Sequence, residues 1–306
     1  MATHPDSVDA NASPTSHMAS ELVSQPDTWQ RAVDLAGART ALPLPGQKVA
    51  IIGCGTSWFM AQSYASLRET AGQGVTDAFA ASEMPAGRDY DAIIALTRSG
   101  TTTEVLELLR ANAGRIRSIG IVGDTASPLV DLVDDLVPLP FADEKSVVQT
   151  RFATTALAFL RASLGEDLSR AIADARTAID SELDAELVGA EQYSFLGSGW
   201  TVGLAHEAAL KMREASQSWT ESYPAMEYRH GPIAIAAPDR VTWMFGAAPA
   251  GLANDVAATG ARFESSAIDP LADLVRAQRV ALARAIAAGL NPDEPRSLTR
   301  SVVLDV

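Results

Sequence analysis

The sequence predicts an α/β protein built from two tandem, doubly wound parallel sheets, each in a three-layer αβα unit. Apolar, strand-like runs alternate with helix-like segments along the chain, an order typical of parallel sheets. The segment LGSGW at 196–200 also echoes IGCGT at 52–56, which indicates two related units. At 306 residues, with 47% hydrophobic residues, the chain is long enough for two cores. The alternative is that unrelated α/β domains share glycine turns after their strands.

The first unit opens with the apolar run 49–53, which ends at a glycine turn and leads into residues 57–69, whose apolar positions have helical spacing. The same order then repeats. We expect a strand at 91–96, a polar turn at 97–103, a helix at 104–112 and a strand at 119–123.

The second unit repeats this pattern after a helical connection at about 152–186. We expect a strand at 193–196, a turn at 197–199, a helix at 202–218, a strand at 241–246 and a helix at 271–288. The predicted organisation is a disordered tail at 1–16, a first unit with its connection at 17–186, and a second unit with a C-terminal tail at 187–306.

Composition narrows the class of ligand. The formal net charge is −14, with 24 Lys and Arg against 38 Asp and Glu, which argues against a nucleic-acid or anionic-membrane surface. No apolar run approaches the roughly 20 residues that span a bilayer, and the first sixteen residues lack the features of a signal peptide. The single cysteine, Cys54, fits a reducing compartment. We therefore expect a cytoplasmic protein with a small ligand.

Two turns rich in hydroxyl groups follow successive strands of the first unit. GCGTS at 53–57 supplies Thr56 and Ser57, and TRSGTT at 97–102 supplies Thr97, Arg98, Ser99, Thr101 and Thr102. Ligands of parallel sheets bind at the carboxyl ends of the strands, where helix N-termini add N–H donors. These turns therefore indicate phosphate binding. Helix capping by Ser and Thr is the alternative explanation.

The helix after LGSGW carries Glu207, Lys211 and Glu214 at spacings of i, i+4 and i+7, which places them on one face. An amphipathic surface helix would show the same spacing. His230 follows in a loop with glycine and proline, and it offers an imidazole that could share a pocket with a carboxylate. A solvated loop histidine is the alternative. The phosphate turns favour the acid–base interpretation.

The sequence lacks the motifs that bind dinucleotides, nucleotide phosphates or metal ions. GCGTSW has no third glycine where a dinucleotide site needs one, and no P-loop sequence occurs. Cys54 and the four histidines have no metal-ligand spacing. We expect neither a metal nor an organic cofactor.

These motifs resemble the sugar isomerase (SIS) domain family, specifically the isomerase half of glucosamine-6-phosphate synthase and the related amino-sugar-phosphate deaminases. The resemblance covers nearly all of the chain after the tail. It rests on HMASELVSQP at 17–26, GCGTS, TRSGTT, LGSG, EAALKMRE, EYRHGP and GLNPDEPRSLTRSV at 289–302.

The resemblance implies two SIS subdomains, with the sugar phosphate held by Thr56, Ser57, Thr97, Ser99 and Thr102. Glu214 matches the family's base that moves a proton between C1 and C2, and His230 matches the ring-opening histidine. Lys211 and Glu207 match site positions. Since this histidine reaches a neighbouring subunit's site in the family, a homodimer is implied.

Three departures from the synthase set the expected reaction. No glutaminase half with an N-terminal nucleophilic cysteine is present, and Arg98 and Thr101 stand where the synthase has glutamine and glutamate, as in the deaminase branch. Arg300 stands at the position of the lysine that forms a Schiff base, and arginine cannot replace that nucleophile. Arg300 is instead expected to hold the substrate or the tail, with Arg98 beside the substrate.

The expected function is conversion of a hexosamine 6-phosphate to a ketose 6-phosphate and ammonia without glutamine. Two enzyme alternatives stay open: a synthase that receives ammonia from a separate glutaminase subunit, and a deglycase that acts on fructosamine phosphates. A phosphosugar sensor without catalysis is a third, although the chain has no helix-turn-helix or basic DNA-binding segment.

Overall fold

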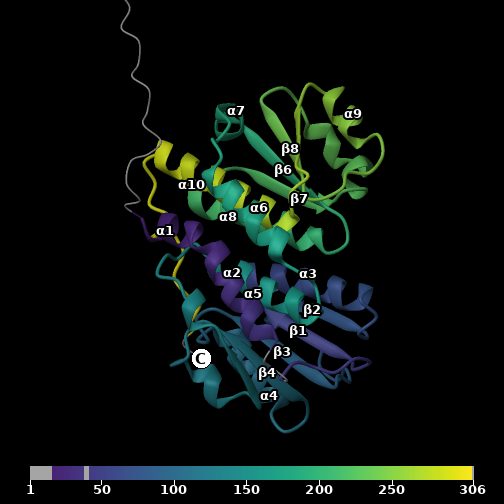
Figure 1. Cartoon of the computed structure of the whole chain (residues 1–306), viewed down its shortest axis with the longest axis vertical. Coiled ribbons are helices and arrows are strands. Elements are labelled where there is room, and N and C mark those ends of the chain that lie inside the picture. The colour runs from purple at the N-terminus through teal and green to yellow at the C-terminus, as the bar shows by residue number, and fades with distance from the viewer. Residues whose placement is uncertain (1–15, 38–40, 305–306) are drawn as a thin grey trace, which may run out of the picture.

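The computed structural model describes residues 16–37 and 41–304 and confirms the predicted α/β class. The first sheet has five parallel strands in the order β2-β1-β3-β4-β5 (Figure 1). Its strands are β1 (Val49–Gly53), β2 (Thr76–Ala80), β3 (Ala92–Thr97), β4 (Arg117–Val122) and β5 (Asp135–Pro138). β1 and β3, which are buried along their whole length, lie next to each other, so the turns that follow them open at the same edge.

The second sheet has four parallel strands in the order β7-β6-β8-β9. They are β6 (Gln192–Gly197), β7 (Thr220–Pro224), β8 (Arg240–Met244) and β9 (Arg262–Ser265). In both sheets the first strand of the unit lies between the second and the third. This shared order agrees with two related units.

Helices enclose both sheets. They are α1 (His17–Val23), α2 (Gln25–Ala36), α3 (Thr56–Thr70), α4 (Thr103–Asn112), α5 (Arg151–Ser163), α6 (Ser169–Asp180), α7 (Ala185–Gly189), α8 (Thr201–Ser216), α9 (Leu252–Ala257) and α10 (Pro270–Ala287). Short 3-10 helices lie at Ala81–Glu83, Pro128–Asp131, Pro140–Ala142, Glu227–His230 and Pro232–Ile235. No described helix is both long and apolar enough to cross a membrane.

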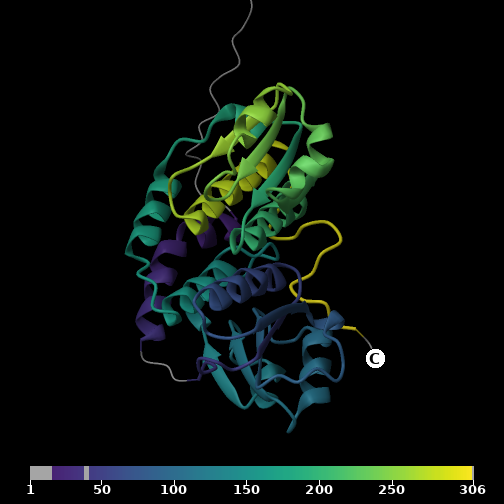
Figure 2. The ribbon, with the colours of Figure 1, turned by 90° about the vertical axis from the view of Figure 1, so that its right-hand side faces the viewer.

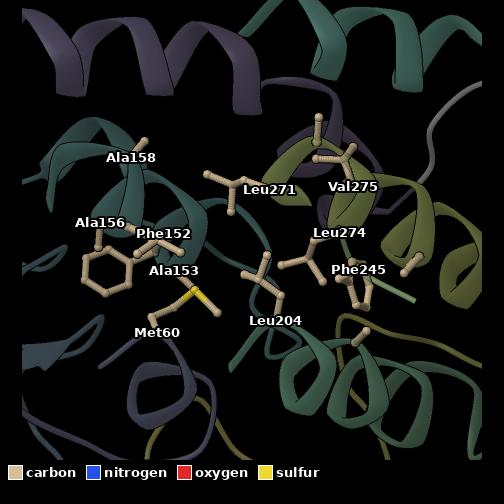
Figure 3. Packing of buried hydrophobic residues seen from close by; sticks show 14 of the residues in the cluster. Met60, Phe152, Ala153, Ala156, Ala158, Leu204, Phe245, Leu271, Leu274 and Val275 are labelled. Carbon is tan, nitrogen blue, oxygen red and sulfur yellow. The ribbon is translucent and has the colours of Figure 1, made fainter. Parts of the chain in front are cut away.

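One hydrophobic core joins the two units. Met60 on α3, Phe152 on α5, Leu204 on α8 and Leu271 on α10 belong to a single buried cluster, shown in Figure 3. The packing of α3 against α8, and of α10 against α6, connects the units through this cluster. The boundary between residues 186 and 187 stays a prediction, because a continuous core runs across it.

The C-terminal segment, residues 289–304, leaves α10 and returns to the first sheet (Figure 2). Asp293 accepts hydrogen bonds from the backbone N–H groups of His17 and Met18 at the start of α1. Further along, the N–H of Thr103 donates to the carbonyl oxygen of Val302 at 3.1 Å. The segment therefore lies against the second hydroxyl-rich turn.

The predicted elements are confirmed with boundary shifts of one or two residues, and the expected helical connection consists of α5, α6 and α7. The sequence analysis did not predict α1, α2, α9 or the strands β2, β5, β7 and β9. β7 and two 3-10 helices lie in the stretch expected to be the histidine loop. The expected disorder of residues 1–16 falls almost entirely outside the described residues.

Candidate active site

The first hydroxyl-rich turn is shaped by glycines. Gly55 has a φ of +52°, and a Cβ on Gly53 would lie 2.7 Å from the backbone of Ser57, so the turn has no room for a side chain there. Thr56 and Ser57 are buried and open α3, whose N-cap is Gly55. Within the described chain, no side chain caps α3 or α4. Capping therefore does not explain the hydroxyl groups.

The second turn is closed partly by its own hydroxyl groups and partly by the C-terminal segment. Thr97 Oγ1 accepts from the N–H of Gly100 at 3.2 Å, and Thr101 Oγ1 donates to Ser99 Oγ at 3.0 Å. Thr101 Oγ1 also lies within hydrogen-bond distance of Ser301 Oγ, at 2.8 Å. Thr102 is the N-cap residue of α4, and its side chain has no hydrogen-bond partner among the described residues. The tail therefore lies against the hydroxyl groups of the second turn.

The predicted row on α8 is buried, so the surface-helix alternative is wrong. The exposed fraction of the side chain is 0% for Glu207, 1% for Lys211 and 19% for Glu214. Lys211 Nζ lies 3.6 Å from Glu207 Oε1 and forms an ion pair with Glu214 Oε2. A buried lysine between two carboxylates is costly to desolvate, which is typical of a functional group rather than a stabilising surface pair.

Burial and charge shift the pKa values in this row. Burial raises the pKa of Glu207 to about 8; attraction to Lys211 opposes that effect and repulsion from Glu214 adds to it. Burial lowers the pKa of Lys211, but the carboxylates of Glu207 and Glu214 outweigh it and hold the value above its usual one. Lys211 is therefore a cation at neutral pH, and Glu207 binds its proton more tightly than an ordinary glutamate does.

The first turn and the α8 row face each other. α3 packs against α8, and a Cβ on Gly55 would lie 3.9 Å from Leu210 Cδ2. Neither carboxylate oxygen of Glu207 has a hydrogen bond within the described chain, although the Thr56 hydroxyl is close enough to lower the carboxyl pKa. A buried carboxyl group without a hydrogen bond, beside a hydroxyl-rich turn, is available to a polyol ligand.

His230 ends the 3-10 helix Glu227–His230, and its side chain is exposed. It makes no hydrogen bond or ion pair with any residue that the structure describes. Two cavities border Glu214, with volumes of about 240 and 710 Å³, and His230 lines neither. Neither of these two cavities, both lined by described residues, brings Glu214 and His230 together.

Three arginine and aromatic side chains that line these cavities were not among the residues expected from the sequence. Arg296 lines both, together with Glu214 and Gln217, and it has no hydrogen bond or ion pair among the described residues. Arg213 and the 74%-exposed Trp219 line the larger one. Arg296 lies within the C-terminal motif GLNPDEPRSLTRSV, so the motif itself pointed to this residue.

Arg98 and Arg300 have protein partners. The guanidinium of Arg98 donates to the carbonyl oxygens of Ser146 at 2.6 Å and Arg300 at 2.7 Å. Arg300 forms an ion pair with Asp143 at 2.6 Å and donates to the carbonyl oxygen of Glu144. Direct substrate contact by either arginine stays a prediction. The alternative role for Arg300, holding the tail, agrees with these contacts.

Cys54 lies in the first turn, and burial raises the pKa of its thiol to about 11. It is therefore a weak nucleophile at neutral pH. No group of three or more His, Cys, Asp or Glu residues in the described part of the chain is arranged to hold a metal ion.

Comparison with known proteins finds relatives that share part of their sequence with this chain. The chain is 28% identical over 366 residues to a glutamine–fructose-6-phosphate aminotransferase (isomerizing) of Bradyrhizobium diazoefficiens, covering 94% of this chain and 59% of the relative. It is 28% identical over 260 residues to the Caulobacter vibrioides enzyme of the same name, covering 71% of this chain and 42% of the relative. The chain spans about half the length of the curated relatives that it matches.

Solved structures share the fold. Glucosamine-6-phosphate deaminase from Thermotoga maritima aligns with a TM-score of 0.82 at 24% identity, covering 94% of this chain and 100% of the other. The C-terminal domain of glucosamine-fructose-6-phosphate aminotransferase from Francisella tularensis has a TM-score of 0.77 at 21% identity, with the same coverages. Tagatose-6-phosphate ketose/aldose isomerase from Escherichia coli has a TM-score of 0.78 at 17% identity, covering 97% of this chain and 99% of the other.

No family model matches the sequence. By sequence the chain is similar to part of the aminotransferases, and its fold is the one seen in solved phosphosugar isomerases. The similarity to these aminotransferases and the shared fold agree with the resemblance to the sugar isomerase (SIS) domain family.

Proposed function

We propose that this protein converts a hexosamine 6-phosphate, with glucosamine 6-phosphate as the first candidate, to a ketose 6-phosphate and ammonia without glutamine. The observation that carries the proposal is the buried row Glu207, Lys211 and Glu214 beside the first hydroxyl-rich turn. The similarity to the Thermotoga maritima deaminase agrees with it, although that likeness extends to the fold alone.

The two turns would bind the phosphate. Thr56, Ser57, Thr97, Ser99 and Thr102 supply hydroxyl groups at the ends of adjacent parallel strands. The first turns of α3 and α4 add backbone N–H donors and a positive dipole end. No lysine is needed for this site.

Glu214 would carry the proton between the two carbons. In the open-chain aldose it removes the C2 proton, and an enolamine forms between C1 and C2. The proton returns to C1 while the C2 amine becomes an iminium. Water then adds at C2 and ammonia leaves, which yields the ketose. Lys211, held cationic by both carboxylates, would orient Glu214 and stabilise negative charge on the C1 oxygen.

The absence of a lysine at Arg300 suits this reaction. Only Lys48, Lys145 and Lys211 occur in the sequence, and Arg300 is paired with Asp143. Deamination uses the substrate's own C2 amine to form the iminium, so no enzyme amine has to attack the sugar. Ring opening would require His230, which we propose to be delivered by a second copy in a homodimer.

Ammonia release tests this function. The purified chain is incubated with glucosamine 6-phosphate and with galactosamine 6-phosphate, without glutamine or any added protein. We expect ammonia and ketose 6-phosphate in equal amounts from one of the two epimers. No release from either, with phosphosugar binding intact, would reject the deaminase assignment.

The larger cavity favours a second candidate, a deglycase for fructosamine 6-phosphates. It measures about 710 Å³, and Glu214 lies on its wall together with the unpaired Arg296. This leaves space for an amino-acid substituent on the sugar nitrogen, with a cation for its carboxylate. Release of free amino acid from a fructosyl-amino-acid 6-phosphate, faster than release of ammonia from either hexosamine phosphate, would favour this candidate.

A further inference from the structure

Arg98 lies at the centre of the second turn, and its side chain is turned into the protein. The residue is 2% exposed. One terminal nitrogen donates to the carbonyl oxygen of Ser146 at 2.6 Å, and the other donates to that of Arg300 at 2.7 Å. Its own carbonyl oxygen accepts from the N–H groups of Gly123 and Asp124 at 3.1 and 2.9 Å. Arg98 therefore links the turn, the 143–150 loop and the C-terminal segment.

Arg300 makes the reciprocal connection. Its guanidinium forms an ion pair with Asp143 and donates to the carbonyl oxygen of Glu144. Its own carbonyl oxygen accepts a hydrogen bond from the guanidinium of Arg98. Two arginines thus clamp the tail to the 143–150 loop. Immediately after the clamp, Ser301 Oγ lies within hydrogen-bond distance of Thr101 Oγ1, and Val302 accepts a hydrogen bond from Thr103.

The loop is a firm anchor for this clamp. The carboxylate of Glu144 accepts from the N–H groups of Thr150 and Arg151, both at 2.7 Å, and of Phe152 at 3.0 Å, at the start of α5. Glu21 of α1 accepts from the N–H of Lys145 at 2.6 Å. The loop is therefore fixed to α1 and α5, and the two arginines hold residue 300 of the tail to it.

The charges around Arg98 balance without a ligand. Asp143, Glu144 and Glu21 attract it and Arg300 repels it, while burial lowers its pKa below the usual value. Both terminal nitrogens already hold carbonyl oxygens. Nε of Arg98 has no hydrogen-bond partner in the described chain, but it is buried with the rest of the side chain.

We infer that Arg98 is a positioning residue that holds the C-terminal segment across the second turn and acts on the substrate only through that segment. The expected effect on KM for the phosphosugar rests on the proposed function. Arg98 holds the segment through its planar guanidinium, whose two terminal nitrogens donate to two carbonyl oxygens. A lysine ammonium is a compact charge and cannot donate to both oxygens in that geometry.

Two substitutions separate geometry from charge. Arg98→Gln removes both, and Arg98→Lys keeps the charge and removes the fork. Arg88→Gln is the matched control, since Arg88 pairs with Asp77 on the surface of the same unit with 51% of its side chain exposed. The structural readout is hydrogen–deuterium exchange of the Thr103 amide and of residues 300–304, because Thr103 N–H is bonded to the tail.

We expect both Arg98 variants to lose protection at Thr103 and along 300–304 and to raise KM for the phosphosugar about tenfold, with kcat changed less than about threefold. The Arg88 control should match the wild type. A lysine variant with wild-type KM and wild-type protection would show that charge alone matters and would overturn the inference, as would unchanged protection in both variants. If the wild type itself has no activity, the proposed function fails while the exchange experiment still decides the positioning role.

Discussion

At the scale of single residues, burial decides what the α8 row can do. Lys211 is almost fully enclosed between two carboxylates, and Glu207 has no hydrogen-bond partner in the described chain. Such groups destabilise a fold unless a ligand or a reaction uses them. Glu207 and Lys211 are therefore stronger evidence for an active site here than the hydroxyl groups of the turns are.

Glu207 should make stability depend on pH. Because its folded-state pKa of about 8 lies above its ordinary value of 4.5, the native state holds a proton that the unfolded chain has released. The free energy of unfolding should thus fall as pH rises between these values.

Glu207→Gln should reduce this dependence of stability on pH, and Glu227→Gln, an exposed control, should keep it. Urea unfolding at about pH 5 and about pH 8 measures the difference. Equal slopes for Glu207→Gln and the wild type would contradict the pKa shift.

The sequence placed Glu207, Lys211 and Glu214 on one face correctly because helical spacing alone determines that. It did not show that the face is buried, since burial depends on how α3 packs against α8. For the same reason it did not show that Arg98 turns inward: its partners, Ser146 and Arg300, are 48 and 202 residues away along the chain.

At the scale of elements, the site depends on close contact between α3 and α8. Gly203 of α8 faces the α3 backbone, and a Cβ there would lie 2.3 Å from both the carbonyl oxygen of Phe59 and Ser63 Oγ. This contact brings the turn that carries Thr56 beside Glu207.

Gly203→Ala should force the two helices apart and destabilise the protein by about 1–3 kcal/mol. Gly189→Ala is the control, because that glycine lies in α7 with no heavy atom within 4 Å of the added Cβ. Thermal unfolding and KM for the phosphosugar together report the effect. A Gly203→Ala protein as stable as the Gly189→Ala control would show that the helices are not in close contact.

Central strands and long helices were predicted well, whereas edge strands were not. β1, β3 and β6 are buried along their length and read as continuous apolar runs. β2, β7 and β9 are only partly buried, so polar residues interrupt their sequences. β7 (TESYP) carries no apolar run and gave no strand signal before it was paired with β6.

At the scale of the whole molecule, the exposed His230 lies outside both cavities that border Glu214. The proposed homodimer resolves this separation because a second copy would supply the imidazole. A two-fold interface would then contain two equivalent sites, each assembled from both subunits.

Subunit complementation tests that arrangement. Glu214→Gln and His230→Ala should each be inactive alone. After unfolding and refolding together in equal amounts, the mixture should recover about one quarter of wild-type activity, since half of the dimers are mixed and each mixed dimer has one intact site. No recovery, with mixed dimers verified by two affinity tags, would place Glu214 and His230 of one site on the same chain.

Proton transfer by Glu214 is the central claim, and deuterium incorporation measures it directly. Glucosamine 6-phosphate or its galacto epimer is incubated with the protein in D2O and followed by NMR. Because the proton that Glu214 takes from C2 exchanges with solvent before it is delivered to C1, we predict deuterium at C1 of the ketose product for the wild type. We predict no incorporation for Glu214→Gln, with phosphosugar affinity within about tenfold. Incorporation that persists in the Glu214→Gln protein would contradict the account.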